Sequence, residues 1–222
     1  MSETYAPEEM AEARSVASHI GARHEMIRTM ELTDPRYADN THQRCYFCKT
    51  ELYTQLQAFA RQFGFEVVVD GTNADDFGDF RPGIRAANRL GVRSPLAEAG
   101  LNKSEIRALA GWLALPTWDK PAAACLSSRF AYGDPITVEK LKMVAAAESA
   151  IRELGFRGFR VRHHGEHARV EFQPADLADA FEREADIISR VCAAGYHSAV
   201  IDAEGYRVGR MNEGLNAHLK PH

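Results

Sequence analysis

Two short segments of alternating polar and apolar residues most strongly limit what this chain can fold into. Residues 158–164 and 167–173 alternate in this way on either side of Gly165, which is typical of a β-hairpin with one buried face. The face predicted to be buried consists of Phe159, Val161, Ala168, Val170 and Phe172. The opposite face carries Arg160, Arg162, Arg169 and Glu171. Three guanidinium groups on one face suit a phosphate or carboxylate ligand, and a solvated face of cross-strand ion pairs is the structural alternative.

Helices and one more strand are expected around this hairpin. Thr137 is a suitable N-cap for a helix over 137–154, and a proline begins a helix over 174–194 that breaks near Arg183. A further strand is expected at 197–201. The resulting order, α-β-β-α-β, predicts a small α+β domain.

The N-terminal part of the chain predicts a mixed α/β arrangement. Apolar residues at helical spacing indicate helices over 7–21 and 45–63, and short strands are expected at 24–31 and 66–69. The second strand runs into a turn made of Gly71, Thr72 and Asn73. An open parallel sheet presents backbone amides to a ligand at such strand ends, so this turn is a candidate nucleotide-binding site.

A second group of helices leads to the domain boundary. A short helix is expected from Pro82 to Leu90, and Asn102 with Glu105 forms a capping box for the next one. The side chains of that helix predicted to be buried are Ile106, Leu109, Ala110 and Leu113. A turn-rich linker follows at 132–135, so we place the boundary between a domain of residues 1–133 and one of residues 134–222.

Composition excludes several classes of protein. The 222 residues are 45% hydrophobic and 26% charged, which is ordinary for a folded chain and not for a disordered one. A formal net charge of −4 gives no general attraction to nucleic acid or to an anionic membrane, so a small-molecule partner is favoured. With no long apolar run, nothing predicts a membrane span, and we expect a cytoplasmic protein whose four cysteines are not structural disulfides.

The stretch WDKPAAACLSSR at 118–129 is the candidate reactive loop. It places Cys125 among small residues between a Lys-Pro pair and Arg129, and rigid scaffolds often carry reactive side chains on such loops. A lone cysteine is otherwise most often a small buried hydrophobic residue. Glu148 is a second candidate, because it lies in register with the apolar residues Leu141, Val144 and Ile151 on the predicted helix. A carboxylate on a buried stripe needs a partner or a function, so we expect a catalytic base or the partner of an arginine.

Cys45 and Cys48 form a C-x-x-C pair at the start of a predicted helix. With Cys125 they would be an iron-sulfur or zinc ligand set, whereas simple packing of the helix start is the structural alternative. Tyr46, between the two cysteines, is a candidate for stacking on a substrate. The histidines at 163, 164 and 167 lack ligand spacing and are expected at the surface.

Several motifs in a fixed order resemble one known family. They are RCYFCK at 44–49, DGTNADD at 70–76, RPG at 81–83, SPL at 94–96 and WDKPAAACLSSR at 118–129, followed by RVR at 160–162. In this order they resemble the LarE-type ATP-dependent sacrificial sulfur transferases, which are members of the PP-loop ATP pyrophosphatases. The resemblance covers nearly the whole chain.

The resemblance implies a fold and a reaction. The fold is an adenine-nucleotide-alpha-hydrolase-like, Rossmann-like parallel sheet domain followed by a small C-terminal domain. The reaction is ATP- and Mg2+-dependent insertion of sulfur into a pyridinium dicarboxylate mononucleotide during nickel-pincer cofactor synthesis. Cys125 would attack the adenylated carboxyl group and then give up its own sulfur, with Glu148 as an acidic residue of the site. The residues to which we assign substrate or phosphate binding are Tyr46, Arg129, Arg160, Arg162, Glu171 and Asp179.

One family motif has no counterpart in the sequence. The phosphate-gripping turn S-G-G-x-D-S is not found, and the chain contains no Gly-Gly dipeptide. We therefore expect an N-terminally truncated sheet domain. Separately, we expect the protein to form a homo-oligomer. Two other functions fit parts of the sequence. One is an iron-sulfur-dependent thiolase of tRNA or a small molecule that uses Cys45, Cys48 and Cys125, and the other is a non-catalytic anion-binding module.

Overall fold

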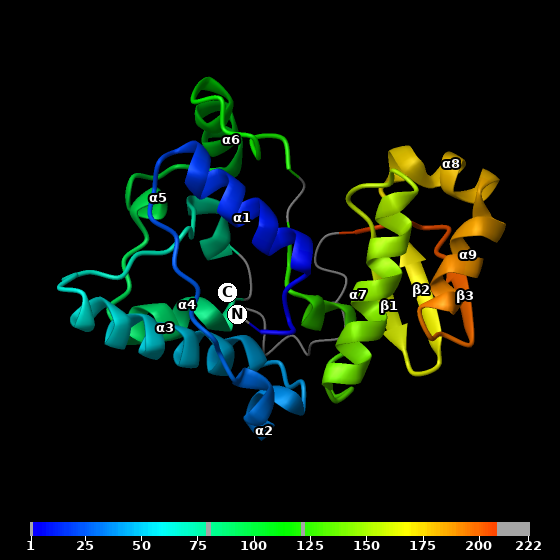
Figure 1. Ribbon diagram of the computed structural model, residues 1–222, viewed down its shortest axis with the longest axis horizontal. Coiled ribbons are helices and arrows are strands. Elements are labelled where there is room, and N and C mark those ends of the chain that lie inside the picture. Colours follow the sequence, from blue (N-terminus) through cyan, green and yellow to red (C-terminus); the bar gives the residue numbers. More distant parts are fainter. Residues whose placement is uncertain (1, 79–80, 121–122, 208–222) are drawn as a thin grey trace. The chain divides into compact units, whose positions relative to one another are not determined.

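The computed structural model describes residues 2–78, 81–120 and 123–207 (Figure 1). The described residues form two compact units. The first contains Ser2 and residues 7–78 and 81–120, and the second contains residues 3–6 and 123–207. The division therefore follows Lys120 rather than Gly133, because the loop around Cys125 packs within the second unit.

The first unit is helical. Its elements are α1 (Pro7–His19), η1 (Glu31–Thr33), α2 (Pro35–Ala38), α3 (Arg44–Gln62), η2 (Ala74–Gly78), α4 (Pro82–Arg89), α5 (Pro95–Glu98) and α6 (Lys103–Trp112). Helices α3 and α4 pack closely around a small core of Tyr53, Ala87 and Val92. Gly83 allows this approach, because a Cβ atom there would lie 3.0 Å from Cγ of Lys49 on α3. The predicted capping box is confirmed: Asn102 accepts from the amide of Glu105, whose side chain accepts from the amide of Asn102.

Neither strand predicted for this unit is found. Residues 24–30 form neither helix nor strand, and at 66–69 only Val69 forms a bridge, a parallel one with Arg93. A strand exists only where a neighbouring chain satisfies its amides and carbonyls, and the described residues of this unit provide no longer partner. Phe65, Val67 and Val69 are consequently 60%, 52% and 56% exposed. The expected Rossmann-like parallel sheet is therefore not confirmed.

The apolar stripe predicted for the helix after Asn102 is also not buried. No residue of α6 is buried, and Leu109 and Leu113 are exposed. Helical spacing establishes that one face is apolar, but burial requires a neighbouring element to cover that face.

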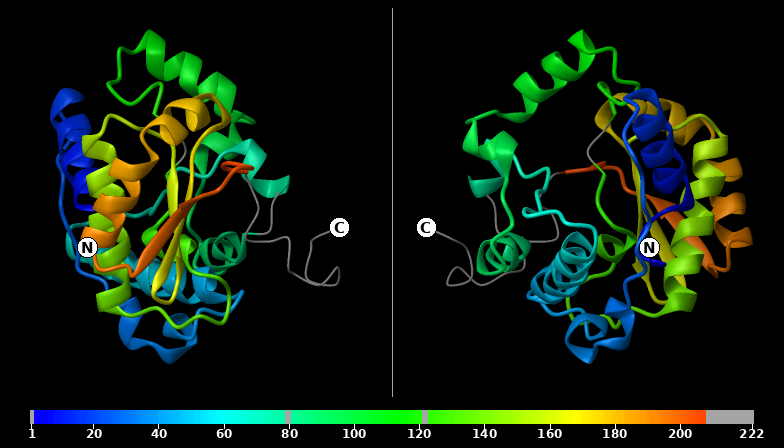
Figure 2. Two further views of the ribbon diagram at one scale, coloured as in Figure 1. Left: turned by 90° about the vertical axis from the view of Figure 1, so that its right-hand side faces the viewer. Right: turned by 60° about the vertical axis from the view of Figure 1, so that its left-hand side comes forward.

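The second unit has the predicted order of elements. They are η3 (Leu126–Arg129), α7 (Val138–Glu153), β1 (Arg160–His164), β2 (His167–Glu171), η4 (Pro174–Asp176), α8 (Leu177–Glu182), α9 (Glu184–Ala193) and β3 (Ser198–Ile201). Strands β1 and β2 are antiparallel, β3 is parallel to β2, and β2 lies in the centre. Helices α7 and α9 pack against each other and cover one face of the sheet (Figure 2).

The hairpin register places the alternating side chains as predicted. Val161 lies opposite Val170, and Arg160 lies opposite Glu171. All five residues of the predicted apolar face are buried. The break in the long predicted helix falls at Arg183, between α8 and α9. The second unit therefore carries the α+β arrangement that the sequence indicated.

Candidate functional site

The candidate reactive loop is held by its backbone. Cys125 precedes η3 with φ −55° and ψ 152°, and its carbonyl accepts from the amide of Ser128 at 3.0 Å. The next amide, that of Leu126, donates to the carbonyl of Thr4 at 2.8 Å. The Cys125 side chain is partly exposed. A fixed backbone thus presents the thiol at the beginning of a short helical turn.

Arg129 ties this loop to helix α7. Its Nε and Nη2 donate to the two carboxylate oxygens of Glu148 at 2.8 and 2.9 Å, and its Nη1 donates to the carbonyls of Ala124 and Cys125 at 2.8 and 3.2 Å. Nη1 also lies 2.8 Å from Oγ of Ser128. The guanidinium group is therefore surrounded by protein acceptors, as in a residue that anchors the loop.

Glu148 connects the same loop to the sheet. It lies on the buried stripe of α7, as predicted, and its Oε1 accepts from the backbone amide of Val161 at 3.1 Å. Strand β1 is an edge strand, so this amide points away from β2 and needs such an acceptor. Of the two roles expected for Glu148, base or partner of an arginine, this geometry favours the second, because both oxygens already accept hydrogen bonds.

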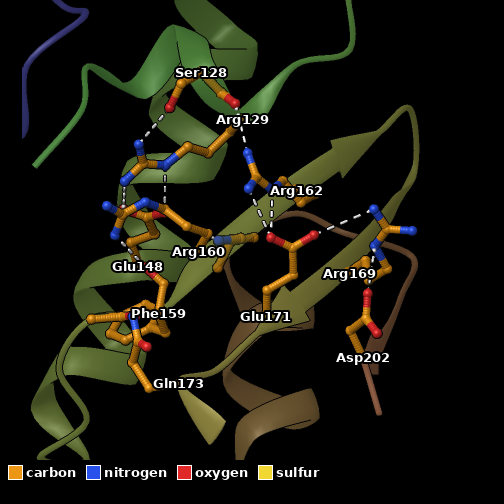
Figure 3. Close-up of polar contacts among 12 residues, drawn as sticks. Ser128, Arg129, Glu148, Phe159, Arg160, Arg162, Arg169, Glu171, Gln173 and Asp202 are labelled. Atoms are coloured by element: carbon orange, nitrogen blue, oxygen red, sulfur yellow. Dashed lines mark hydrogen bonds and ion pairs between the residues drawn. The ribbon is translucent and has the colours of Figure 1, made fainter. Parts of the chain in front are cut away.

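The charged face of the hairpin forms a chain of ion pairs (Figure 3). Nε of Arg162 donates to Oε2 of Glu171 at 2.8 Å, and its Nη1 donates to the carbonyl of Ser128 at 2.8 Å. On the other side of Glu171, Arg169 approaches Oε1 at 3.4 Å and continues to Asp202 at 3.3 Å. Ser128 therefore contacts both Arg129 and Arg162, which joins the cysteine loop to the arginine-bearing strand.

The cluster carries an excess of positive charge. It contains five arginines, at 129, 152, 160, 162 and 169, and three carboxylates, at 148, 171 and 202. Burial and the neighbouring charge of Arg129 lower the pKa of Arg160, while the Glu148 carboxylate acts in the opposite direction. A guanidinium stays protonated even so. An anionic ligand would relieve the repulsion, which is the property expected of a phosphate or carboxylate site.

Asp179 lies outside this network of contacts. It is on α8 with a side chain 55% exposed, and it forms an ion pair with Arg183 one turn later, at 3.3 Å. Such an exposed i,i+4 pair is ordinary helix surface.

Tyr46 and the 71–73 turn belong to the first unit. The hydroxyl of Tyr46 accepts from Nη1 of Arg89 at 2.7 Å, and Cζ of Arg85 lies 5.5 Å from the centre of its ring. The ring is thus set between two exposed cationic side chains of α4.

The backbone amides of the turn are largely engaged. Those of Thr72 and Asn73 donate to side-chain oxygens of Asp70 and Asp76, at 3.1 Å each. The amide of Asp75, just after the turn, donates to Oδ1 of Asn73 at 3.1 Å. The expected display of amides to a ligand is therefore limited in this conformation.

The cysteines and histidines provide no metal site in the described part of the chain. None of the four cysteines forms a disulfide, and no group of three or more His, Cys, Asp or Glu residues described in the structure could hold a metal ion. Cys45 and Cys48 belong to the first unit and Cys125 to the second, so the ligand set of these three cysteines stays a prediction. His163, expected at the surface, is instead buried between Phe130 and Tyr196.

Sequence reasoning missed Ser128 and Asp202 as members of the network. Ser128 belongs to the WDKPAAACLSSR motif, but it contacts Arg162 through its backbone carbonyl, and every residue type has such a carbonyl, so the sequence does not single it out. Asp202 directly follows the last strand, and the carboxyl end of a strand is a common place for polar site residues.

The structure contains no membrane span in the described residues, since every helix there is too short or too polar to cross a bilayer.

Comparison with known proteins identifies the family. No protein-family model matches the chain. The chain is 44% identical to an uncharacterised protein of Synechocystis sp., over 94% of this chain and 79% of that protein. It is 36% identical to pyridinium-3,5-bisthiocarboxylic acid mononucleotide synthase of Lactiplantibacillus plantarum, over 96% of this chain and 78% of the synthase. An uncharacterised protein of Methanocaldococcus jannaschii is 32% identical over 76% of this chain and 66% of its own length. On this similarity, and in agreement with the motifs from RCYFCK to WDKPAAACLSSR, the chain belongs to the LarE-type family.

Proposed function

We propose that this protein is a sulfur transferase of nickel-pincer cofactor biosynthesis. In this proposal it inserts sulfur into a pyridinium dicarboxylate mononucleotide, and Cys125 is the sacrificial donor. The name of the Lactiplantibacillus plantarum relative supports the substrate class, because a bisthiocarboxylic acid mononucleotide is the product of replacing carboxyl oxygen by sulfur. The proposed cytoplasmic location and homo-oligomeric state stay predictions.

The observation that carries the proposal is the connection between the cysteine loop and the arginine-bearing strand. Arg129 holds the carbonyl of Cys125, and Ser128 accepts from Arg162 through its own carbonyl. A thiol and a set of guanidinium groups are thereby fixed within one network. A mononucleotide with a carboxyl group and a phosphate group needs these two kinds of group in a fixed relation.

The covalent steps follow from the chemistry of the thiol. The Cys125 thiolate attacks the carbonyl carbon of the adenylated carboxyl group, and AMP leaves with the electron pair of the broken C–O bond. A general base then accepts the Cα proton of Cys125, the Cα–H electron pair forms the Cα=Cβ bond, and the Cβ–S bond breaks with its electron pair left on sulfur. The substrate leaves as a thiocarboxylate and dehydroalanine remains in the chain. Each protein molecule is therefore consumed once.

Within this mechanism the charged residues bind and orient. Arg160 and Arg162 are proposed to bind the nucleotide phosphate, with Glu171 fixing the orientation of Arg162. Arg129 and Glu148 are proposed to hold the loop at the position that the reaction requires. Asp179, which is exposed on α8, is the weakest of the proposed binding residues.

ATP and Mg2+ are proposed as the activating nucleotide and its metal. The 71–73 turn fits this role only in part, because the amides of Thr72 and Asn73 are engaged with Asp70 and Asp76. Gly71, Thr72 and Asn73 are therefore proposed to contact the nucleotide, without an assigned phosphate contact.

Intact-protein mass spectrometry tests the proposal. After incubation with ATP, Mg2+ and pyridinium-3,5-dicarboxylic acid mononucleotide, the wild-type protein should lose about 34 Da, the mass of hydrogen sulfide. Cys192→Ser, which changes a cysteine on α9 outside the network, should lose the same mass. Cys125→Ser should lose none. A wild-type protein that forms thiocarboxylate without any loss of mass would contradict the sacrificial mechanism.

A non-catalytic anion-binding module is the second candidate, and the excess of arginines over carboxylates favours it. The same experiment separates the two functions. The module predicts binding of the mononucleotide, dependent on Arg160 and Arg162, with no thiocarboxylate and no change of mass.

A further inference from the structure

A turn that follows β3 contacts Arg160 directly and is linked to Arg162, the other arginine proposed to bind phosphate, through Arg169 and Glu171. Residues 202–206 leave β3 and continue along the central strand β2. The amide of Asp202 donates to the carbonyl of Val170 at 2.9 Å, and the amide of Tyr206 donates to the carbonyl of Phe172 at 2.7 Å. The turn is closed by the amide of Gly205, which donates to the carbonyl of Asp202 at 3.0 Å. The segment is therefore fastened to the sheet at both ends.

Gly205 is required for this turn. Its φ is +69°, and a Cβ atom at this position would lie 2.8 Å from the carbonyl oxygen of Phe172. Any side chain would therefore combine unfavourable backbone conformation with a clash against backbone that cannot move easily. The close approach sets the distance between the turn and β2 and, with it, the position of Tyr206, the next residue.

The first contact is between an aromatic ring and a guanidinium group. Cζ of Arg160 lies 5.2 Å from the centre of the Tyr206 ring, within the range of a cation–π interaction. Arg160 also donates from Nη1 to the carbonyl of Phe159 at 2.7 Å. These two contacts define the plane and the direction of a long side chain that would otherwise sample several rotamers.

The second contact passes through two further residues. Oδ2 of Asp202 lies 3.3 Å from Nε of Arg169, and Arg169 in turn lies 3.4 Å from Oε1 of Glu171. The other oxygen of Glu171 accepts from Arg162 at 2.8 Å. Figure 3 shows this series of ion pairs running across the sheet from Asp202 to Arg162. Glu171 is completely buried, so its orientation depends on these two arginines.

We propose that Asp202 and Tyr206 are positioning residues that hold Arg162 and Arg160 ready to receive the phosphate of the substrate. This inference rests on the proposed function. An arginine side chain loses up to about 2 kcal/mol of rotamer freedom when it is fixed, and a side chain fixed before binding does not pay this cost when the ligand arrives. One turn thus orders both Arg160 and Arg162 before the phosphate binds.

Two ligands that differ only in the phosphate group test this role. We propose calorimetric titration of the protein with nicotinic acid mononucleotide and with nicotinic acid riboside at one ionic strength. In the wild-type protein the mononucleotide should bind more tightly. Tyr206→Leu should weaken the mononucleotide about tenfold, which corresponds to about 1.4 kcal/mol, and leave the riboside unchanged. Tyr206→Phe keeps the ring and should match the wild type.

Asp202→Asn should also weaken binding of the mononucleotide relative to the riboside, because it removes the charge that orients Arg169. A matched pair of glycine variants separates positioning from simple loss of stability. Gly205→Ala should lower the affinity for the mononucleotide. Gly155→Ala, with φ +95° but open space around its Cβ position, should lower stability without this loss.

The outcomes distinguish the inference from the function on which it rests. A wild-type protein that binds both ligands equally contradicts the phosphate site of the proposed function. If the wild-type protein prefers the mononucleotide and Tyr206→Leu and Asp202→Asn show the same preference, only the positioning role is overturned. Equal weakening of both ligands in these variants would also overturn it, since that is the mark of a general structural defect.

Discussion

Arg129 and Glu148 form a bidentate ion pair, with both N–O distances below 3.0 Å and side chains only 5% and 3% exposed. Two charges removed from water in this way are stable only together, because either one alone would keep the cost of burial without its partner. The pair joins the loop of Cys125 to helix α7, and through the amide of Val161 to the edge of the sheet. The position of the candidate nucleophile therefore depends on a charge pair inside the unit.

Removal of one partner of this pair should strongly destabilise the protein. We expect Arg129→Met and Glu148→Leu each to lower the free energy of unfolding by about 3–5 kcal/mol, because each leaves a buried charge without its bidentate partner. After Arg129→Met, Glu148 keeps only the more distant ion pair with Arg152, at 3.8 Å. The double variant should lose clearly less than the sum of the two single losses. Urea denaturation of the four proteins measures this coupling. Glu153→Gln, on the same helix with a side chain 69% exposed, should change stability by less than about 0.5 kcal/mol. Additive single losses would contradict the interpretation of a coupled pair.

Arg162 should not tolerate replacement by lysine. Its guanidinium group contacts the carboxylate of Glu171 and the carbonyl of Ser128 at the same time, and an ammonium group cannot reproduce this planar set of donors. We expect Arg162→Lys to weaken mononucleotide binding by about tenfold, measured by calorimetry. Arg190→Lys, in an exposed pair with Asp186 on α9, should bind as the wild type does. Full affinity in Arg162→Lys would show that only its charge matters.

Stability should fall in weak acid because of His163. The ring is buried, its Nδ1 lies 3.1 Å from the hydroxyl of Tyr196, and burial lowers its pKa against the opposing effect of the Asp134 carboxylate. A lowered histidine pKa contributes stability that is fully present above the unfolded value near 6.5 and is lost as the pH falls through the folded value. Thermal denaturation at pH 7.5 and 5.5 measures the loss. His163→Phe keeps an aromatic ring but cannot be protonated. Its Tm should therefore fall less between pH 7.5 and 5.5 than that of the wild type, by about 2–4 °C for each kcal/mol of pH-dependent stability that the substitution removes. An unchanged pH dependence would exclude His163 as its source.

Asp70 should contribute stability that disappears in strong acid. Burial raises the pKa of its carboxyl group, but hydrogen bonds from Ser94, Tyr53 and the amide of Thr72 together hold this pKa below its usual value. The contribution is present above the unfolded pKa near 3.8 and is lost as the pH falls through the lower folded value.

We therefore expect Asp70→Asn to lower the free energy of unfolding by about 1–2 kcal/mol at pH 7 and by progressively less below pH 3.8. Urea denaturation at pH 7 and at a pH below 3.8 measures both values. Asp119→Asn, at an exposed position, is the control and should cost less than about 0.5 kcal/mol at pH 7. A cost that persists unchanged in acid would mean that the carboxylate charge is not the cause.

The C-terminal unit could be predicted in detail because its signals are local. The N-cap at Thr137, the alternation on both sides of Gly165 and the break at Arg183 all concern residues close to one another in the chain. The strands predicted at 24–31 and 66–69 failed for the opposite reason. Apolar sequence gives a segment the ability to be a strand, but only a neighbouring strand makes it one, and Val69 meets only Arg93.

The sequence by itself determined the family, the order of elements in the C-terminal unit, and the presence of Cys125, Glu148, Arg160 and Arg162 as residues to be explained. Only the tertiary structure decided their partners. It paired Glu148 with Arg129, connected Arg162 through Glu171 and Arg169 to Asp202, and set Tyr206 against Arg160. Ion pairs and ring contacts depend on distances in space, and the chain sets those distances only when helix, hairpin and final turn have packed together.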